Sequence, residues 1–353
     1  MQRKNSLPGS GDPAFYATQL RGELGLRSRR YAQGRHHVES YGNPSVIVFP
    51  PSQDTCGNSL HGNFLDAAWQ AICANAGWLR RFDKVHTQGA RSLPKPQLDP
   101  SRRWRELDSS MSSDALLMNV FCTPGVVESS ALQSALGVDS NVAPVFGWKA
   151  RVPLANGRFD RTEVDMRLGS LLVEAKLTES GFQTREAMIV EAYRDFDLVF
   201  DRDLLPRIQL PAKRRRLPAE FPENYSQEFE SFIDADRGNG LAPLPMEPLQ
   251  RAPAAPEDAP PAAYAGYQLI RNVLAAYAAE SSFCVLHDER RPDLREQWFQ
   301  IMAAVRSADM RTRCQVLTWQ EIAPLLPEDL QQFLDLKYGI AGAGRTPSSV
   351  DQH

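Results

Sequence analysis

The chain has 353 residues, enough for one large domain or two small ones. Hydrophobic residues make up 42% and charged residues 24%, as in ordinary soluble globular proteins, and the formal net charge is −3. A net charge this close to zero does not indicate nucleic-acid binding. It does not exclude it either, because acidic residues elsewhere can cancel the charge of a local basic groove in the sum.

The cysteines and the N-terminus exclude further classes. The five cysteines are scattered, and no two are spaced as a zinc-binding pair; they are Cys56, Cys73, Cys122, Cys284 and Cys314. The N-terminus lacks the apolar segment of a secretory signal, and no stretch has the length and apolarity of a membrane span. We therefore expect a cytoplasmic protein with reduced thiols and no membrane partner.

Residues 1–104 predict a loose arm followed by accessory helices. The first 35 residues are polar and basic, with a short helix expected at about 15–24. An apolar run at 45–49 is a candidate strand. Helical spacing follows, with Asn63 as the expected N-cap and Gly77 as the expected stop. The proline-containing stretch 87–103 is expected to be loop.

The character of the chain changes after residue 105. A helix is expected from Ser112 or Ser113, either of which can cap it, to Phe121. A strand at 148–154 ends at the hairpin dipeptide Asn156 and Gly157. Two further strands, 162–168 and 171–177, flank a two-residue turn. Helical periodicity then covers 182–200.

The last third alternates helices and strands. Helices are expected at 264–281, 292–306, 320–326 and 328–338, and strands at 283–286 and 315–318. Residues 206–263 are irregular and rich in Pro and Ala toward their end, which indicates an insertion, and the tail 341–353 is expected to be disordered. The order β-β-β-α, then α-β-α-β-α, predicts an α/β domain at 105–340, with a central mixed sheet flanked by helices.

The chemistry concentrates on the two strands around the turn of Gly169 and Ser170. Side chains alternate between the faces of a strand. The first strand should therefore show Glu163, Asp165 and Arg167 on one face, and Val164, Met166 and Leu168 on the other. In the next strand, Leu172, Glu174 and Lys176 share a face.

The length of the turn sets how these faces meet. A two-residue loop pairs Leu168 with Leu171, which places Asp165 opposite Glu174 and Glu163 opposite Lys176. Like charges directly opposite are destabilising, and one of the two carboxyl groups is expected to have a raised pKa. Their joint use as ligands of Mg²⁺ would explain the pair, since this ion prefers oxygen ligands and keeps waters for substrate and nucleophile. Lys176 can orient or help deprotonate a water and offset charge on a phosphate.

The alternative is an exposed amphipathic hairpin with mixed charges, because an Asp followed by Glu-x-Lys often arises by chance. The placement of the acidic residues on adjacent strands across a tight turn, with apolar residues behind them, favours the functional interpretation.

Asp165 and the triplet Glu174-Ala175-Lys176 resemble the PD-(D/E)xK superfamily of restriction-endonuclease-like nucleases. The resemblance implies a restriction-endonuclease-like core and a Mg²⁺ ion, with Mn²⁺ as an alternative. It implies that Asp165, Glu174 and the backbone carbonyl of Ala175 bind the metal and that Lys176 activates water. Val164 stands where many members have a proline, a position that varies across the superfamily.

Two helices extend the resemblance to about 112–338. The helix at 112–121 is similar to the helix that precedes the hairpin in a bacterial, largely uncharacterised branch of these nucleases. In the superfamily, that preceding helix often carries an acidic metal-site residue. Asp114 and Glu128 are the candidates, and Glu163 is a further accessory one. The later helix resembles one whose Gln and Arg face the site, which implies a catalytic Gln268 and an accessory Arg271. A solvated helix face is the alternative for these two.

The basic run Lys213, Arg214, Arg215 and Arg216 is a candidate phosphate-binding segment, or simply a solvated loop. These features together predict a Mg²⁺-dependent nuclease that cleaves DNA in restriction, repair or defence. A catalytically inactive module that binds nucleic acid or protein is one alternative, and an RNA-cleaving relative is another. Sequence specificity stays open, and so does the oligomeric state, for which a homodimer is one option.

Overall fold

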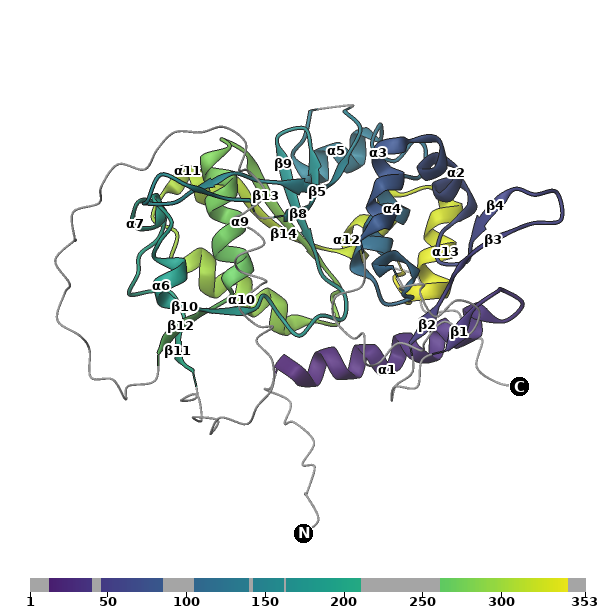
Figure 1. The fold of residues 1–353 in the computed structure, drawn as a ribbon, viewed down its shortest axis with the longest axis horizontal. Coiled ribbons are helices and arrows are strands. Elements are labelled where there is room, and N and C mark those ends of the chain that lie inside the picture. Colours follow the sequence, from purple (N-terminus) through teal and green to yellow (C-terminus); the bar gives the residue numbers. More distant parts are fainter. Residues whose placement is uncertain are drawn as a thin grey trace, which may run out of the picture.

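The computed structural model describes residues 13–39, 46–84, 105–139, 142–161, 163–210 and 261–341. A five-stranded sheet of order β14-β13-β9-β8-β5 lies between two groups of helices (Figure 1). Its strands are β5 (Val145–Lys149), β8 (Glu163–Leu168), β9 (Leu171–Ala175), β13 (Ser282–His287) and β14 (Cys314–Thr318). The first three run antiparallel, and β9, β13 and β14 run parallel. The predicted α/β fold with a mixed central sheet is confirmed.

Two hydrophobic clusters cover the two faces of the sheet. Val173 and Leu286 enter the first cluster, whereas Leu172 and Val285 enter the second, as alternation along a strand requires. The helices on the first face are α1 (Pro13–Ala32), α4 (Ser113–Phe121), α5 (Ser130–Leu136), α12 (Trp319–Ile322) and α13 (Glu328–Tyr338). Those on the second are α6 (Ala187–Val190), α7 (Phe196–Val199), α9 (Tyr267–Ala278), α10 (Pro292–Ala303) and α11 (Ala308–Thr312).

The N-terminal segment packs on the first face. Its elements after α1 are β1 (Val38–Glu39), β2 (Ile47–Val48), β3 (Pro51–Gln53), β4 (Ser59–His61), α2 (Asp66–Ala74), α3 (Ala76–Leu79) and the 3-10 turns η1 (Arg80–Asp83) and η2 (Glu106–Asp108). The helix expected at about 15–24 forms and is longer than expected. Because Leu20 and Leu24 of α1 are fully buried in the first cluster, the segment from residue 13 onward packs on the core and is not a loose arm. A third cluster joins α2 and η1 to α4. The N-terminal segment thus shares a core with the rest; the boundary at residue 104 stays a prediction.

Asn63 and Gly77 have other roles than predicted. Leu65 is the N-cap of α2, and Gly77 lies inside α3, which is capped by the side chain of Asn75. Asn63 is fully buried instead, and its Nδ2 donates to the carbonyls of Leu107 at 2.7 Å and Ser109 at 2.9 Å. The side-chain amide of Asn63, predicted from the sequence to cap a helix, therefore bonds to a distant segment of the chain instead.

The predicted helix at 182–200 is divided into the two short helices α6 and α7. Its first residues instead form β10 (Thr184–Glu186), which pairs with β12 (Ala262–Ala265), and β12 pairs with β11 (Arg207–Gln209). Partners distant in sequence override the local helical periodicity. The same sheet orders both ends of the predicted insertion. Residues 211–260 and 342–353 lie outside the described residues.

Three local predictions hold with shifted bounds. Ser112 caps α4 by accepting a hydrogen bond from the amide of Ala115 at 3.1 Å. Asn156 and Gly157 lie between β6 (Val152–Pro153) and β7 (Phe159–Asp160), a separate small hairpin. The C-terminal helices are α12, the 3-10 turn η3 (Ala323–Leu325) and α13. None of the helices in the described ranges combines the length and apolarity that crossing a bilayer requires.

Asn63→Ala should destabilise the protein by about 2–4 kcal/mol. The change removes the two hydrogen bonds to Leu107 and Ser109 and takes the side-chain acceptor from Lys337, whose buried Nζ lies 2.6 Å from Asn63 Oδ1. Urea denaturation followed by circular dichroism measures the effect. Gln70→Ala, an exposed position on α2, is the matched control and should change the midpoint little. A shift as small as that of the control would contradict a structural role for Asn63.

Candidate active site

The β8–β9 hairpin has the predicted register. Leu168 pairs with Leu171, and the ladder ends at Met166 and Val173, so the next opposed residues are Asp165 and Glu174. Beyond that pair, Asp165 Oδ2 accepts a hydrogen bond from the amide of Ala175 at 2.8 Å. A side chain thus takes the place of a backbone partner and fixes the carboxylate where the ladder ends.

Gly147 of the edge strand β5 lies opposite Asp165, between two ladder pairs. Its φ is 62°, in the left-handed region that favours glycine. The alternation of side chains along β8 is interrupted here. Residues two apart on a regular strand share a face, but Met166 packs in the first cluster and Val164 packs in the second. The prediction that Val164 and Met166 share a face is therefore wrong. A backbone kink opposite Asp165 turns β8 at the candidate site.

Glu174 and Lys176 are almost entirely buried, with 2% and 5% of their surface exposed. Lys176 Nζ donates to Glu174 Oε1 at 2.6 Å, and Asn272 Nδ2 of α9 donates to Glu174 Oε2 at 2.8 Å. Both carboxylate oxygens are thereby held in place. Within the described residues, Asn272 Oδ1 is buried without a hydrogen-bond partner, so a donor from a ligand or a water would satisfy it.

The charge state of Lys176 follows from its neighbours. Burial alone would lower the pKa of the ammonium group, but the nearby carboxylates of Glu174, Glu179 and Asp165 outweigh burial and raise that pKa. Lys176 is therefore a cation at neutral pH. It can orient a water or offset negative charge, and it is poorly suited to remove a proton.

Asp165 is the carboxyl group with a raised pKa. Burial is the largest cause, and the charges of Glu174 and Asp114 add to it. This agrees with the expectation from the sequence that one of the two opposed carboxyl groups has a raised pKa. Asp114, at the start of α4, is buried and close enough to act on Asp165, whereas Glu128 is exposed. Of the two candidates named from the sequence, Asp114 is therefore the one that lies near Asp165.

Two cations from the N-terminal segment reach the same acidic group. Arg81 Nη2 lies 2.7 Å from Asp114 Oδ2, and Arg81 Nη1 lies 2.6 Å from Glu163 Oε1. Lys84 Nζ lies 3.2 Å from Asp114 Oδ2 and 3.3 Å from Glu163 Oε1. Burial would raise the pKa of Asp114, but Arg81 and Lys84 outweigh burial and hold that pKa below its usual value.

The expected attraction between Glu163 and Lys176 is replaced by these contacts. Glu163 pairs with Arg81 and Lys84, while Lys176 turns to Glu174. The strand positions agree with the register, but β9 ends at Ala175, and the amide of Lys176 bonds to the carbonyl of Leu286 on β13. Side chains beyond the end of a ladder are not constrained to face each other.

The remaining candidates have mixed placements. Arg271 Nη2 donates to the carbonyl of Glu163 at 3.3 Å, and its guanidinium lies 5.5 Å from the centre of the Tyr267 ring, so it lies beside the start of β8. Gln268 is half-buried one turn before Asn272, and Asn272 is the α9 residue that contacts Glu174. The basic run from Lys213 to Arg216 lies outside the described residues.

Sequence reasoning missed Arg81, Lys84 and Asn272. The i, i+4 spacing of Gln268 and Asn272 places both on one helix stripe and could have drawn attention to Asn272. The two cations come from a segment that matched no motif, and only the tertiary packing of η1 against α4 brings them to the site.

The residues fit a hard divalent cation. In the described ranges, no three His, Cys, Asp or Glu side chains already converge as a complete metal site. The oxygen donors are instead the carboxylates of Asp165 and Glu174, with the Ala175 carbonyl as the third ligand implied by resemblance. Burial is the largest cause of the raised pKa of Asp165, and the charges of Glu174 and Asp114 add to it; a cation at the site would offset those two charges.

Comparison with known protein families gives a match over residues 27–339, to the family described as "Restriction Endonuclease associating with ARP". The match includes the N-terminal segment that carries Arg81 and Lys84 as well as the hairpin and α9. Neither the curated proteins nor the solved structures compared with the chain gave a match. The chain belongs to the family of restriction endonucleases associating with ARP, and both its restriction-endonuclease-like fold and its nuclease-related character follow from that membership.

Proposed function

We propose that the protein is a Mg²⁺-dependent nuclease that hydrolyses phosphodiester bonds in DNA, in restriction, repair or defence. The observation that carries the proposal is the meeting of Asp165, Glu174 and Lys176 at the open end of one hairpin, in a chain of a restriction-endonuclease family.

The carboxylates of Asp165 and Glu174 and the carbonyl of Ala175 would hold the metal ion. Bound there, Mg²⁺ supplies Lewis-acid polarisation of the phosphoryl group and a more acidic water. Asn272 contributes by position, because its hydrogen bond fixes Glu174 Oε2 and limits the orientations of that carboxylate.

Lys176 acts as a fixed cation in this proposal. Its raised pKa keeps the proton on Nζ, so the ammonium group orients the attacking water and offsets charge that develops on the phosphate. The hydrogen bond to Glu174 Oε1 and the ring of Phe182, 5.6 Å from Nζ, set its position.

Arg81 and Lys84 bring two further positive charges beside the site. Burial would lower the pKa values of both side chains, but the nearby carboxylates, Asp114 first among them, together outweigh burial and raise those pKa values. The charge of Asp165 adds to this effect, so both cations lie close to Asp165. An anionic phosphate at the site would meet these cations, which are the residue types that bind phosphate in nucleic acids. Their ion pairs with Asp114 and Glu163 hold them in place before substrate binds.

Asp165→Asn, Glu174→Gln and Lys176→Met should each lower cleavage about 100-fold or more, since loss of one charge-stabilising group has effects of that size. Cleavage of plasmid, single-stranded DNA and RNA is measured with Mg²⁺, Mn²⁺ or EDTA. Lys149→Met removes an exposed cation from β5 and serves as the control. Wild-type activity in the Lys176 variant, or cleavage in EDTA, would contradict the proposed mechanism.

Stability should respond to pH through Asp165. A carboxyl group whose pKa is raised by folding stabilises the protein below the ordinary carboxyl pKa of about 4, and that contribution is lost as pH rises through the raised value. In EDTA at pH 8, Asp165→Asn should therefore melt about 1–3 °C above the wild type, and the difference should vanish near pH 4.

Melting curves with added Mg²⁺ complete this test. The metal should raise the melting temperature of the wild type and leave that of Asp165→Asn unchanged. Asn keeps a side-chain oxygen for the amide of Ala175, so the hydrogen bond is preserved. A less stable Asn variant at pH 8 that still gains from Mg²⁺ would show that Asp165 neither repels Glu174 nor binds the metal.

The basic run at 213–216 offers a separate test of DNA binding. Changing Lys213, Arg214, Arg215 and Arg216 to Gln should weaken binding equally for unrelated duplexes. It should also reduce the slope of log K against log salt by about 0.9 for each lost phosphate contact. Fluorescence anisotropy in EDTA at several salt concentrations gives both quantities. An unchanged slope would identify the run as a solvated loop.

A further inference from the structure

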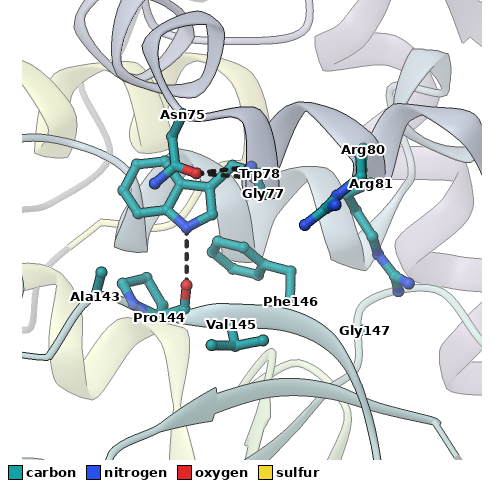
Figure 2. Close-up of a pocket in the computed structure, with 10 residues that line it drawn as sticks. All are labelled: Asn75, Gly77, Trp78, Arg80, Arg81, Ala143, Pro144, Val145, Phe146 and Gly147. Atoms are coloured by element: carbon teal, nitrogen blue, oxygen red, sulfur yellow. Dashed lines mark hydrogen bonds between the residues drawn. The ribbon is translucent and has the colours of Figure 1, made fainter.

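A pocket of about 460 Å³ lies between the α3–η1 turn and the start of β5 (Figure 2). One wall is the turn formed by α3 and η1, which contributes Asn75, Trp78 and Arg80. The other wall is the start of the edge strand β5, including Phe146. Pockets of roughly 300–1,000 Å³ hold small organic groups, so the volume suits one nucleotide and excludes a duplex.

The pocket adjoins the catalytic residues through Gly147 and Arg81. Gly147 lines the pocket and lies opposite Asp165 across the β5–β8 ladder. A Cβ at Gly147 would collide with the guanidinium of Arg81, which also lines the pocket and pairs with Glu163. Because opposed residues of antiparallel strands are about 4.5–5.5 Å apart between Cα atoms, the pocket lies about one nucleotide from Asp165.

The aromatic wall is held rigidly. Trp78 Nε1 donates to the carbonyl of Pro144 at 2.8 Å, and the backbone amide of Trp78 donates to Asn75 Oδ1 at 3.2 Å. The ring centres of Trp78 and Phe146 are 6.1 Å apart in an edge-to-face arrangement. Fixed aromatic rings at a nucleic-acid site are stacking platforms for bases.

The polar groups of the pocket complement a nucleotide. Arg80 is exposed, and the described part of the chain gives it no ion-pair partner, so its guanidinium can meet a phosphate. Asn75 uses its side-chain oxygen to cap α3, and its amide nitrogen has no hydrogen bond to any described residue. That nitrogen is a donor for a carbonyl or ring nitrogen on the edge of a base.

We propose that this pocket binds one unstacked nucleobase of the DNA strand that is cut, adjacent to the scissile phosphate. The inference rests on the proposed nuclease function and deepens it. Unstacking a paired base costs a few kcal/mol, and that cost is smallest where the nucleotide is already unpaired. The protein should therefore prefer single-stranded DNA, or duplexes with an unpaired nucleotide, over fully paired duplexes.

Binding in EDTA tests the pocket without cleavage. The full chain is titrated into a labelled single strand, a fully paired duplex, and the same duplex with one unpaired nucleotide. Trp78→Ala should weaken binding of the single strand about 5- to 150-fold, the range expected for loss of one stacked base. Trp78→Phe keeps an aromatic ring and should restore most of the affinity. Binding of the paired duplex should not change.

Two other variants guard against misfolding. Arg80→Gln should weaken single-strand binding and lower its salt slope by about one, because an exposed phosphate contact is lost. Leu79→Ala changes the adjacent residue, which is 42% exposed, and should bind like the wild type. Equal affinity of wild type and Trp78→Ala for the single strand would overturn the proposal. Equal losses on paired and unpaired DNA would also overturn it.

A separate outcome would identify failure of the proposed function itself. If the wild-type protein with Mg²⁺ or Mn²⁺ cleaves no nucleic acid, the nuclease proposal fails, whatever the binding data show. If the wild type cleaves DNA and Trp78→Ala binds the single strand as tightly as the wild type, only the pocket assignment fails.

Discussion

The crowding of three carboxyl groups, those of the buried Glu174 and Asp114 and of the half-buried Asp165, is the constraint on which the candidate site depends. Like charges in such surroundings repel strongly, and buried charges without partners are costly. The chain offsets this with a cation or amide at each acidic residue: Lys176 and Asn272 hold Glu174, and Arg81 with Lys84 holds Asp114. Asp165 accepts a hydrogen bond from the amide of Ala175, and burial together with the charges of Glu174 and Asp114 raises its pKa. A metal ion bound at Asp165 would offset part of this crowded negative charge.

The N-terminal segment is part of this arrangement. Its 3-10 turn η1 carries Arg81 to Asp114 and Glu163, and the adjoining α3 carries Trp78 to the edge strand β5. The guanidinium of Arg81 passes over Gly147, where any side chain would obstruct it. Covering an edge strand with a helix also protects its free backbone groups from pairing with other chains. One segment thus completes the charge balance, forms the pocket and covers the edge of the sheet.

Local rules were sufficient for the hairpin. Alternation along two strands and a two-residue turn predicted the register and the opposition of Asp165 and Glu174. The kink at Gly147 was not predictable, because a lone glycine in a strand does not reveal a positive φ, and it moved Val164 to the other face. The single helix expected at 182–200 does not form, because residues 184–186 pair as a strand with β12, which lies far along the chain.

Contacts between distant segments account for the rest. Arg81 and Lys84 meet Asp114 only after α2, η1 and α4 share a cluster, and no local pattern marks that cluster. On α9, the sequence analysis selected Gln268 and Arg271, whereas the residue that contacts Glu174 is Asn272, one turn after Gln268. Sequence periodicity specifies a face of a helix; the depth of each residue along that face depends on how the helix packs.

The buried pair of Asn63 and Lys337 has a consequence for the order of assembly. Lys337 Nζ lies 2.5 Å from the carbonyl of Asn63, although the two residues are 274 positions apart. Closing so long a loop is entropically unfavourable and tends to be slow. Four aromatic rings surround the Lys337 ammonium group, so this contact also joins α13 to α1 and the N-terminal strands. During synthesis the segment that carries Arg81 is made well before its anchor on α13. The acidic residues of the site are therefore made before Lys337, which anchors the segment that carries Arg81 and Lys84. The balance of charges at the site depends on the folded chain that includes α13.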